Sequence, residues 1–421
     1  MLSGRTLRTG SSPKRSPDIV RISWQKRGFK IAKTTVVTQT PRERAFLVAV
    51  THKSGVKTVS TEDSLEELAQ LAGTAGARVV GKLTQSLPVP SKSYYVGKGK
   101  LTELQALKET AGYDVAVFDD ELSPLQQRNL EESLGVKIID RAALILDVFA
   151  RRARTREGQL QVELAQHQYL LPRLAGQWSH LERLGGGIGT RGPGEAQLET
   201  DRRLIRRRIH HLDQQIERVR KQRMLYRQRR RKSGIPVVAL VGYTNAGKST
   251  LLNALSQADV PSENRLFTTL DPTTRRITLA DRSPVLLSDT VGFIRKLPPA
   301  IITAFRATLE ELSEASMLLH VVDFASHRAP EECQTVEDIL TDLNLADKPI
   351  VTVLNKIDLL LDSSRTWTEQ EALEYLSSQG ESQNEKVVLV SAAKKWGLPG
   401  LLESIARTLT DNSTRVRVQS G

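Results

Sequence analysis

The stretch that most constrains the fold of this chain is the octapeptide GYTNAGKS, residues 242–249. An apolar, β-branched run at residues 235–241 precedes it and a helix-like run at residues 249–255 follows it, which predicts strand, loop and helix. In this G-x-x-x-x-G-K-S spacing, the glycines let backbone N–H groups surround phosphate oxygens. Lys248 can then reach the β- and γ-phosphates, while the Ser249 hydroxyl ligates Mg²⁺ at the helix N-terminus. The pattern predicts a phosphate-binding loop, and the less specific interpretation is a chance glycine-rich turn.

Three later motifs indicate which nucleotide this loop binds. In DTVG, residues 289–292, the carboxylate can hold Mg²⁺ through water and the glycine N–H can reach the γ-phosphate. In NKID, residues 355–358, Asp358 can accept two hydrogen bonds from guanine that adenine cannot donate. Such bonds to a charged group contribute about 1.5–3 kcal/mol each, which is enough to select guanine. SAA, residues 391–393, would present backbone N–H groups to the guanine oxygen. Each motif follows a strand-like run, so all four meet at one edge of a parallel sheet and predict a GTP-binding domain.

The segment between the phosphate loop and DTVG reads LFTTLDPT over residues 266–273. We expect one of its threonines to reach Mg²⁺ and the γ-phosphate as switch I, with Thr269 preferred over Thr268. An ordinary threonine-rich loop is the alternative. After Gly292, where related hydrolases often carry a glutamine that orients water, this chain has Phe293. Intrinsic hydrolysis should therefore be slow and should need a partner or a cation.

These expectations define a candidate site. We expect Lys248, Thr269 and Gly292 to act directly in catalysis. Ser249 and Thr269 are the predicted direct Mg²⁺ ligands, and Asp289 is the predicted ligand through water. The full set of predicted GTP-binding residues is Gly242, Tyr243, Thr244, Asn245, Ala246, Gly247, Lys248, Ser249, Phe267, Thr268, Thr269, Leu270, Asp271, Asp289, Thr290, Val291, Gly292, Asn355, Lys356, Ile357, Asp358, Ser391, Ala392 and Ala393.

Composition narrows the class of protein. The chain has 421 residues, 39% of them hydrophobic, and contains no apolar run near the roughly 20 residues of a membrane span. Its single cysteine, Cys333, excludes a disulfide framework and a cysteine zinc site, and suits a reducing compartment. A formal net charge of +13 points to an anionic partner. We expect a cytoplasmic monomer with no transmembrane segment, and a membrane-peripheral fraction is the alternative.

Most of the charge lies in one predicted helix, residues 195–232. From residue 202 to 232 there are fourteen Lys and Arg against two acids, a net +12. A solvated helix face is normally mixed in sign, and like charges one turn apart repel, so this helix predicts contact with structured RNA. The residues expected to bind RNA are Arg191, Arg202, Arg203, Arg206, Arg207, Arg208, Arg220, Lys221 and Arg223.

The same helix carries apolar residues in steps of four and three, which indicates a coiled-coil seam. These residues are Ile205, Ile209, Leu212, Ile216, Val219 and Tyr226. Its predicted partner is the helical region at residues 142–171, with a break near Glu157–Gly158, and the two form an antiparallel hairpin. The loop LGGGIGTRGPG, residues 184–194, would form the hairpin tip.

The remaining regions complete the expected domain organisation. Residues 44–140 alternate strands at 45–50, 77–83, 115–118 and 136–139 with helices at 64–71, 99–111 and 124–134, the first capped by Ser64. The basic turn YYVGKGK at residues 94–100 is either a nucleotide loop with altered spacing or a contact for RNA phosphate. Residues 1–43 form a basic disordered tail, or alternatively an organelle transit peptide that would place the protein in a stroma or matrix. Residues 141–233 hold the hairpin, 234–411 the GTPase domain and 412–421 a disordered tail.

The predicted fold class is thus α/β: a P-loop GTPase domain, with a mostly parallel sheet flanked by helices, preceded by a small α/β domain and a helical coiled-coil hairpin. GYTNAGKST, FTTLDPTTR, DTVGF, ILDVFARRARTREGQLQVELAQ, LLPRL and RLGGGIGTRGPGEAQLETDRR together resemble the HflX family of GTPases, over residues 44–409. The resemblance implies binding to the large (50S) ribosomal subunit and its rRNA, and the splitting or rescue of stalled or idle ribosomes, notably in heat stress. It also implies that Asn245 coordinates a stimulating K⁺. One departure is Ala196, where the family usually has threonine.

Two other functions fit the same residues. A GTPase that assembles the large subunit would bind immature rather than mature particles. A GTP-switch regulator that acts on proteins would bind its partner without strong dependence on salt, and the +12 helix argues against it.

Overall fold

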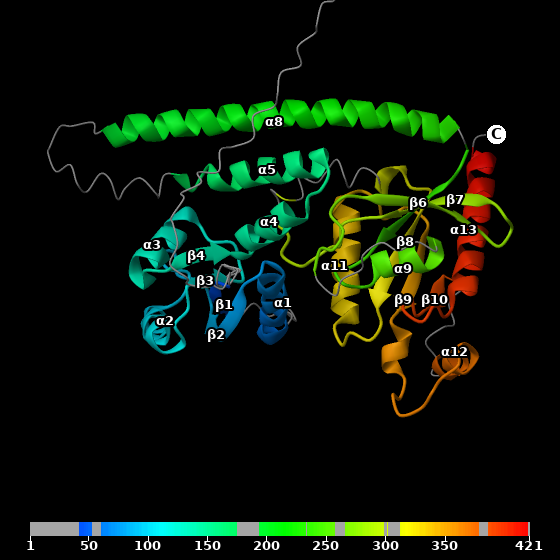
Figure 1. Ribbon diagram of the computed structural model, residues 1–421, viewed down its shortest axis with the longest axis horizontal. Helices are drawn as coiled ribbons and strands as arrows, with labels where there is room; N and C mark the ends of the chain where they lie inside the picture. Colours follow the sequence, from blue (N-terminus) through cyan, green and yellow to red (C-terminus); the bar gives the residue numbers. More distant parts are fainter. Residues whose placement is uncertain are drawn as a thin grey trace, which may run out of the picture. The chain divides into compact units, whose positions relative to one another are not determined.

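A computed structural model describes residues 42–52, 60–174, 193–232, 234–256, 266–298, 301, 312–378 and 386–419, without the side chains of residues 193–198, 226–232 and 413–419. They belong to one compact unit, Arg42–Gly421, and residues 1–41 of the predicted N-terminal tail lie outside the described residues. The structure confirms the predicted fold class, because an α/β sheet, a helical segment and a second α/β sheet follow one another along the chain, and the second sheet carries the phosphate-binding loop (Figure 1).

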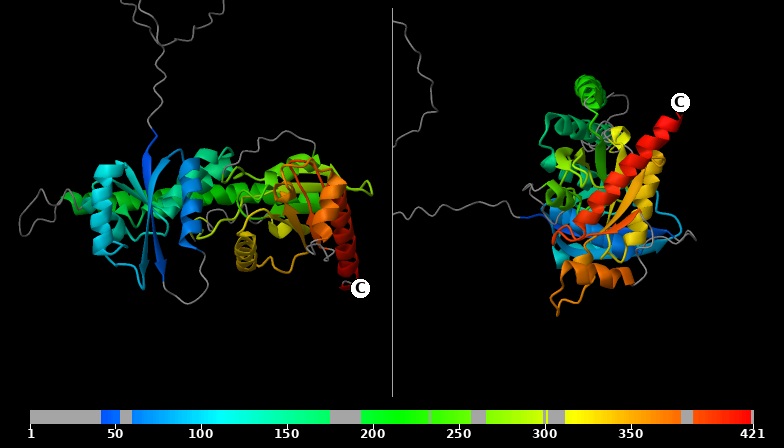
Figure 2. Two further views of the ribbon diagram at one scale, coloured as in Figure 1. Left: turned by 90° about the horizontal axis from the view of Figure 1, so that it is seen from below. Right: turned by 90° about the vertical axis from the view of Figure 1, so that its right-hand side faces the viewer.

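The first sheet has four parallel strands in the order β2-β1-β3-β4. The strands are β1 (Arg44–His52), β2 (Arg78–Leu87), β3 (Val115–Phe118) and β4 (Lys137–Asp140). Alternate residues of β1 face opposite sides, so Leu47 joins a core with helices α1 (Thr61–Thr74) and α4 (Arg141–Arg152). Val48 joins a separate core with α2 (Lys98–Ala111) and α3 (Pro124–Leu134) (Figure 2). Burial on both faces explains why β1 is a continuous apolar run.

Sequence reasoning found these elements but misplaced one cap. Helix α1 begins after Ser60, whose hydroxyl accepts a hydrogen bond from the Asp63 N–H, so the predicted cap at Ser64 is wrong. The Ser64 hydroxyl instead donates to Asp119 at 2.6 Å. In the YYVGKGK turn, Tyr95 is buried against Phe118.

The helical segment forms a hairpin of α5 (Arg156–Leu170) and α8 (Pro193–Lys232), which lie along each other (Figure 1). Leu160 and Leu164 of α5 enclose Leu212 of α8, which is fully buried. Ile209, Ile216 and Val219 pack against this cluster, as the seam predicted.

Two ion pairs along the hairpin set its direction. Arg208 of α8 pairs with Glu163 of α5, and Arg223 pairs with Glu157. Partner numbers rise along one helix as they fall along the other, so the helices are antiparallel, as expected. The predicted break at Glu157–Gly158 is misplaced, since it falls at residues 153–155, between α4 and α5. Nearly all of the predicted tip loop lies outside the described residues.

The second sheet has six strands in the order β10-β9-β8-β5-β7-β6, parallel except for the edge strand β6. They are β5 (Val237–Val241), β6 (Thr273–Thr278), β7 (Pro284–Asp289), β8 (Met317–Asp323), β9 (Ile350–Asn355) and β10 (Val387–Leu389). Helices α9 (Lys248–Ser256) and α13 (Leu398–Gln419) cover one face, and α11 (Ala329–Asp342) covers the other. A short helix, η1 (Ile357–Leu360), follows β9, and α12 (Glu369–Ser378) precedes β10.

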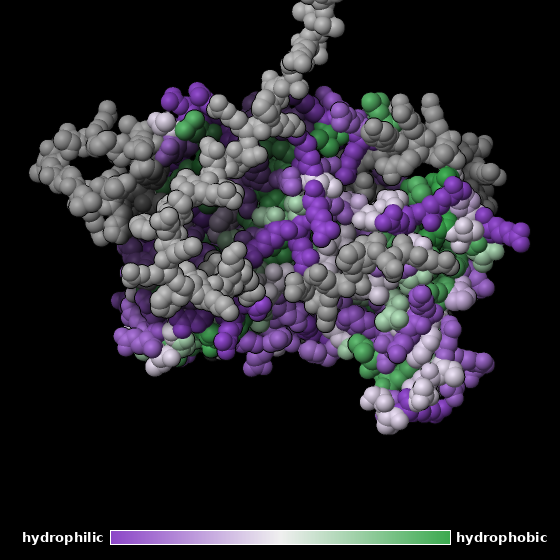
Figure 3. All heavy atoms as spheres, in the orientation of Figure 1, coloured by the Kyte–Doolittle hydropathy of each residue, from purple (hydrophilic) through white to green (hydrophobic). Residues whose placement is uncertain are grey.

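Helix α13 corrects one further expectation. It continues to Gln419, so the tail predicted from residue 412 is largely helical. Within the described residues, no helix has the length and apolar character needed to cross a bilayer. On the face drawn in Figure 3, hydrophilic residues cover most of the described surface and apolar ones form separate patches.

We predict that Leu212→Ala loosens the hairpin, because it leaves a cavity between Leu160 and Leu164. The local opening free energy of α5 and α8, measured by amide hydrogen exchange, should fall by about 2–4 kcal/mol. The matched control is Leu204→Ala, since Leu204 lies on the same helix but is 53% exposed. Equal effects of the two changes would show that Leu212 does not hold the helices together.

Candidate active site

Two glycines shape the phosphate-binding loop between β5 and α9. Gly242 has φ +151°, and a Cβ there would lie 2.2 Å from the Val321 carbonyl oxygen. Gly247 has φ +96°, and a Cβ there would lie 2.2 Å from Asn355 Nδ2. Side chains at these positions would therefore collide with the neighbouring strand ends. The backbone can turn as a phosphate cradle requires only because both residues are glycine.

Lys248 is held in place at the start of α9. Its Nζ donates to the carbonyl oxygens of Gly242 at 3.0 Å and Tyr243 at 2.7 Å, and the side chain is buried. Burial lowers the Lys248 pKa to about 8, although the Asp289 carboxylate partly opposes the shift. Behind it, burial lowers the pKa of His320 to about 4, assisted by the Lys248 ammonium. The loop thus holds its cation in position for an anion.

Three oxygens meet beside this lysine. Asp289 Oδ2 accepts hydrogen bonds from Ser249 Oγ at 2.6 Å and Thr269 Oγ1 at 2.7 Å, and the two hydroxyl oxygens are 2.8 Å apart. Asp289 Oδ1 is buried and has no hydrogen-bond partner. Burial raises the Asp289 pKa, and a cation here would favour the charged form. Hydroxyl and carboxylate oxygens are ligands that Mg²⁺ prefers, so these residues fit the predicted ion.

A narrow cleft of about 40 Å³ opens over these groups. Its walls bring together residues of the phosphate loop, switch I and DTVG that lie far apart in the sequence. They are Thr244, Asn245, Gly247, Lys248, Ser249, Thr250, Phe267, Thr268, Thr269, Thr290 and Gly292.

The predicted guanine-binding motifs also meet. Asn355 Nδ2 donates to the Ala246 carbonyl, and Asn355 Oδ1 accepts from the Ala392 N–H, so this side chain joins two loops. Asp358 accepts from the Ser391 hydroxyl at 2.6 Å, which orients its carboxylate. Lys356 Nζ pairs with Asp323 at 2.6 Å.

The DTVGF segment runs beside the phosphate loop. The Phe293 N–H donates to the Gly242 carbonyl at 3.1 Å, and the Thr244 N–H donates to the Phe293 carbonyl at 2.7 Å. The Phe293 side chain is buried in the core and stays out of the cleft. A Cβ on Gly292 would approach the Thr244 backbone to 2.9 Å, so glycine permits this contact.

Some predicted site residues direct their side chains elsewhere. Leu270 is buried in the core, and the Thr290 hydroxyl donates to the Leu240 carbonyl. Asp271 accepts hydrogen bonds from the backbone N–H groups of Arg154 and Thr155, at the start of α5. Thr290 still lines the cleft, but Leu270 and Asp271 support the site without lining it, and Asp271 departs most from its predicted role.

Tyr243 of the phosphate loop connects the two sheets. Its hydroxyl donates to Glu67 of α1 at 2.6 Å and accepts from the Arg295 N–H at 3.0 Å. Both Tyr243 and Glu67 are buried. Burial, with the Glu67 carboxylate, raises the Tyr243 pKa far above its usual range, so the hydroxyl keeps its proton. The segment after Gly292 is thereby fixed against the N-terminal sheet.

Arg141 completes this network. Its guanidinium, fully buried, pairs with Glu67 at 3.0 Å and with Asp119 at 2.9 Å. Lys296, four residues after Gly292, pairs with Asp119 and with Asp120 at 2.6 Å. Asp119 and Asp120 follow β3 at the carboxyl edge of the first sheet, where open α/β sheets bind ligands. Here that edge receives a lysine of the GTPase part.

One group of cations on the basic helix faces away from the hairpin partner. At 3.6 residues per turn, Arg203, Arg207, Arg218 and Lys221 lie within about 60° of one another, opposite the buried Leu212. All four are exposed. Among the predicted RNA-binding residues, Arg208 and Arg223 instead pair with α5, and Arg191 lies outside the described residues. Arg202 is half-buried, and Arg206 and Arg220 are exposed.

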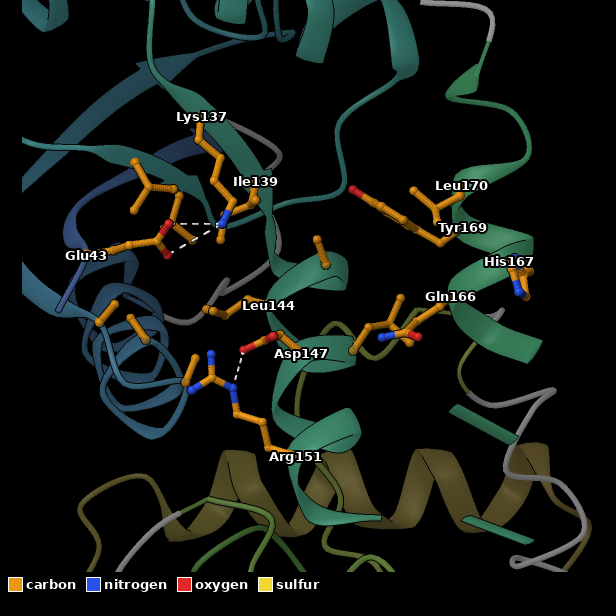
Figure 4. A pocket seen from close by; sticks show the side chains of 17 residues that line it. Glu43, Lys137, Ile139, Leu144, Asp147, Arg151, Gln166, His167, Tyr169 and Leu170 are labelled. Carbon is orange, nitrogen blue, oxygen red and sulfur yellow. Dashed lines mark hydrogen bonds and ion pairs between the residues drawn. The ribbon is translucent and has the colours of Figure 1, made fainter. Parts of the chain in front are cut away.

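A larger cavity of about 440 Å³ lies between the first sheet and helices α4 and α5. Its walls are mostly apolar, and two ion pairs, Glu43–Lys137 and Asp147–Arg151, lie at its edges (Figure 4). Because these charges satisfy each other, the cavity has less of the character of a phosphate site than the cleft at Lys248.

Sequence reasoning missed the residues that hold the loops from outside. Glu67, Asp119 and Arg141 precede the phosphate loop by a hundred residues or more, and no local motif marks them. Their one signal is the presence of charged residues in apolar surroundings, since buried charges need partners.

Comparisons with known proteins agree with this geometry. Three family patterns match: "GTP-binding GTPase N-terminal" at residues 62–150, "GTP-binding GTPase Middle Region" at 152–230 and "50S ribosome-binding GTPase" at 237–356. GTPase HflX of Caldanaerobacter subterraneus subsp. tengcongensis is 51% identical over 368 residues, 87% of this chain and 81% of that protein. GTPase HflX of Escherichia coli K12 is 46% identical over 348 residues, 83% of this chain and 79% of that protein.

We predict that nucleotide affinity depends on the protonation of Lys248. The pKa of Lys248 is about 8 in the free protein, and bound phosphate raises it. Below pH 8 the lysine is charged in both states, so affinity is constant. Above pH 8 the free protein must take up a proton to bind, so the affinity for GDP should fall by up to about tenfold per pH unit. Calorimetry from pH 7 to 9.5 measures both the affinity for GDP and the number of protons taken up on binding. An affinity that does not change with pH, without proton uptake, would contradict the pKa assigned to Lys248.

We also predict that Tyr243→Phe weakens the link between the sheets. The change removes a donor to buried Glu67 and an acceptor for the Arg295 N–H. The free energy of unfolding in urea should fall by about 1–3 kcal/mol. Tyr375→Phe is the control, because Tyr375 is 45% exposed and should tolerate the change. An unaltered stability for Tyr243→Phe would mean that the buried bond contributes nothing net.

Proposed function

The chain belongs to the HflX family of GTPases, and we propose that it uses GTP to act on the large ribosomal subunit. It binds GTP and hydrolyses it to GDP and phosphate. The pattern that matches its GTPase part describes a 50S ribosome-binding GTPase, and the exposed basic face of α8 supports such a partner. We propose that it splits or rescues stalled or idle ribosomes, especially in heat stress, as a cytoplasmic monomer.

In the proposed chemistry, Lys248 and the loop N–H groups bind the phosphates. Water attacks the γ-phosphorus, and the bond to the β–γ bridging oxygen breaks, which leaves GDP. Ser249, Thr269 and Asp289 would hold Mg²⁺, which neutralises charge on the phosphates when bound. The Gly292 N–H would donate to the γ-phosphate, next to the backbone contact of Phe293 with the phosphate loop.

Asp358 selects guanine in this proposal by accepting two hydrogen bonds from the base. The Ser391 hydroxyl donates to this carboxylate and orients it. Asn355 would act indirectly, because both of its polar atoms make hydrogen bonds that join the loops around the base. We assign a stimulating K⁺ to Asn245, whose φ of +64° suits a tight loop. K⁺ would add positive charge beside the phosphates.

Stimulation by a partner follows from Phe293. Its ring is buried and cannot orient water. At this position the protein therefore lacks the water-orienting glutamine that related hydrolases use. The main support for a ribosomal partner is the exposed basic face of α8 opposite Leu212. Four exposed cations on that face suit contact with RNA phosphates, and the arginines that pair with α5 keep the helix rigid.

We predict that purified large ribosomal subunits accelerate GTP turnover at least about tenfold in potassium buffer, since a partner should supply what Phe293 cannot. The subunits should stimulate less in sodium buffer. Binding to immature particles only would favour the assembly function, and turnover unaffected by any ribosomal particle would contradict the proposal.

The same assay tests the basic face. Arg203→Glu, Arg207→Glu and Lys221→Glu together should weaken binding to the subunit at least about a hundredfold at 0.15 M salt. Turnover without subunits should stay unchanged. The matched control reverses the exposed Arg275, Arg276 and Arg282 of the GTPase part. Co-sedimentation measures binding, and equal losses for both triple variants would place the contact elsewhere.

A further inference from the structure

Residues 266–271, the first part of switch I, are held at both ends by the helical segment that precedes the GTPase part. At its start, Phe267 is buried with φ +56° and stacks edge-on against Phe149 of α4, with ring centroids 4.6 Å apart. At its end, Asp271 faces the turn between α4 and α5. Both attachments lie outside the GTPase sheet.

Asp271 accepts three hydrogen bonds from that turn. Its Oδ2 accepts from the Arg154 N–H at 2.9 Å and from the Thr155 N–H at 2.8 Å, and its Oδ1 accepts from the Thr155 hydroxyl. The Thr155 oxygen also accepts from the Gly158 N–H at 3.0 Å, as the cap of α5. One carboxylate therefore binds switch I to the first turn of the hairpin.

Gly158 makes this approach possible. A Cβ at that position would lie 2.5 Å from Asp271 Oδ1, so even a methyl group would displace the carboxylate. The φ of Gly158 does not require glycine, since it is an ordinary position in the first turn of α5. Glycine is therefore needed at this position because of the close approach of Asp271, and not because of its backbone conformation.

Between the two attachments lies Thr269, whose hydroxyl contacts Ser249 and Asp289. Thr269 is two residues from Asp271, so its backbone lies at most about 7 Å along the chain from the attachment point. A shift of the α4–α5 turn that Asp271 follows would therefore pull on the chain only two residues from the Thr269 hydroxyl.

We propose that the α4–α5 turn is a positioning element for GTP hydrolysis, in which Thr155, acting through Asp271, sets the place of Thr269. This rests on the proposed role of Thr269 at the metal. The same turn begins the hairpin, since Glu157 pairs with Arg223 of α8. Binding of a partner to the hairpin thus reaches switch I over a path of two hydrogen-bonded residues. A subunit bound to the hairpin would regulate turnover through these residues.

The test uses the full-length protein without ribosomes, so that it is independent of the ribosomal proposal. Asp271→Ala should lower kcat for GTP at least about tenfold and raise the Mg²⁺ concentration for half-maximal turnover, because Thr269 is no longer held. GDP affinity should change less than about threefold, since switch I acts on the γ-phosphate and its metal. Asp271→Asn should recover most of the rate, because an amide oxygen can still accept from both N–H groups.

Gly158→Ala separates positioning from stability. Alanine is favoured over glycine in a helix, so α5 should be no less stable, but the new methyl group displaces Asp271. We expect the same fall in kcat and rise in Mg²⁺ requirement, with a melting temperature no lower than that of Asp271→Ala, although the new methyl group also meets Thr155 Oγ1 at 3.3 Å. An unaltered kcat and Mg²⁺ midpoint in Gly158→Ala, or in a folded Asp271→Ala, would overturn the proposal.

Discussion

The buried guanidinium of Arg141 is the interaction on which the joining of the two sheets depends. Two carboxylates, Glu67 and Asp119, are buried in the N-terminal part, and each alone would be costly there. Arg141 pairs with both, and each retains a contact with the GTPase part, from Tyr243 and Lys296. Removal of one partner from such a network leaves an uncompensated charge, which is strongly destabilising. The phosphate loop is thus attached, through Tyr243, to the buried charge network that stabilises the N-terminal part of the protein.

Switch I and the segment after Gly292 both have supports outside the GTPase sheet. The segment after Gly292 is held through Arg295 by Tyr243 and Glu67, and switch I is held through Asp271 by Thr155. One apolar cluster also runs from the N-terminal sheet through Phe149 to Phe267 and the GTPase sheet. The N-terminal half therefore acts as a scaffold that sets the geometry of hydrolysis, and the hairpin is a continuation of that scaffold.

The sequence predicted what is local and repetitive. The phosphate loop, the hairpin seam and most strands follow from spacing within a few residues, because backbone geometry and burial set those periods. The supports of the site depend on contacts between distant segments. Nothing near Asp271 indicates that it faces Thr155, 116 residues earlier, so it was predicted to line the pocket. The predicted α1 cap is wrong for a similar reason, because the Ser64 hydroxyl donates its hydrogen bond to Asp119, which lies 55 residues later.

The contacts of Asp271 imply that switch I and the first turn of the hairpin move together. The most direct measurement is hydrogen exchange at the backbone amides of Arg154 and Thr155, which donate to Asp271. With Mg²⁺ and a non-hydrolysable GTP analogue, Thr269 should be fixed, and we expect both amides to exchange at least about tenfold more slowly than with GDP. Equal exchange in the two nucleotide states, while Thr269 itself becomes protected, would contradict the coupling of the GTP site to the hairpin.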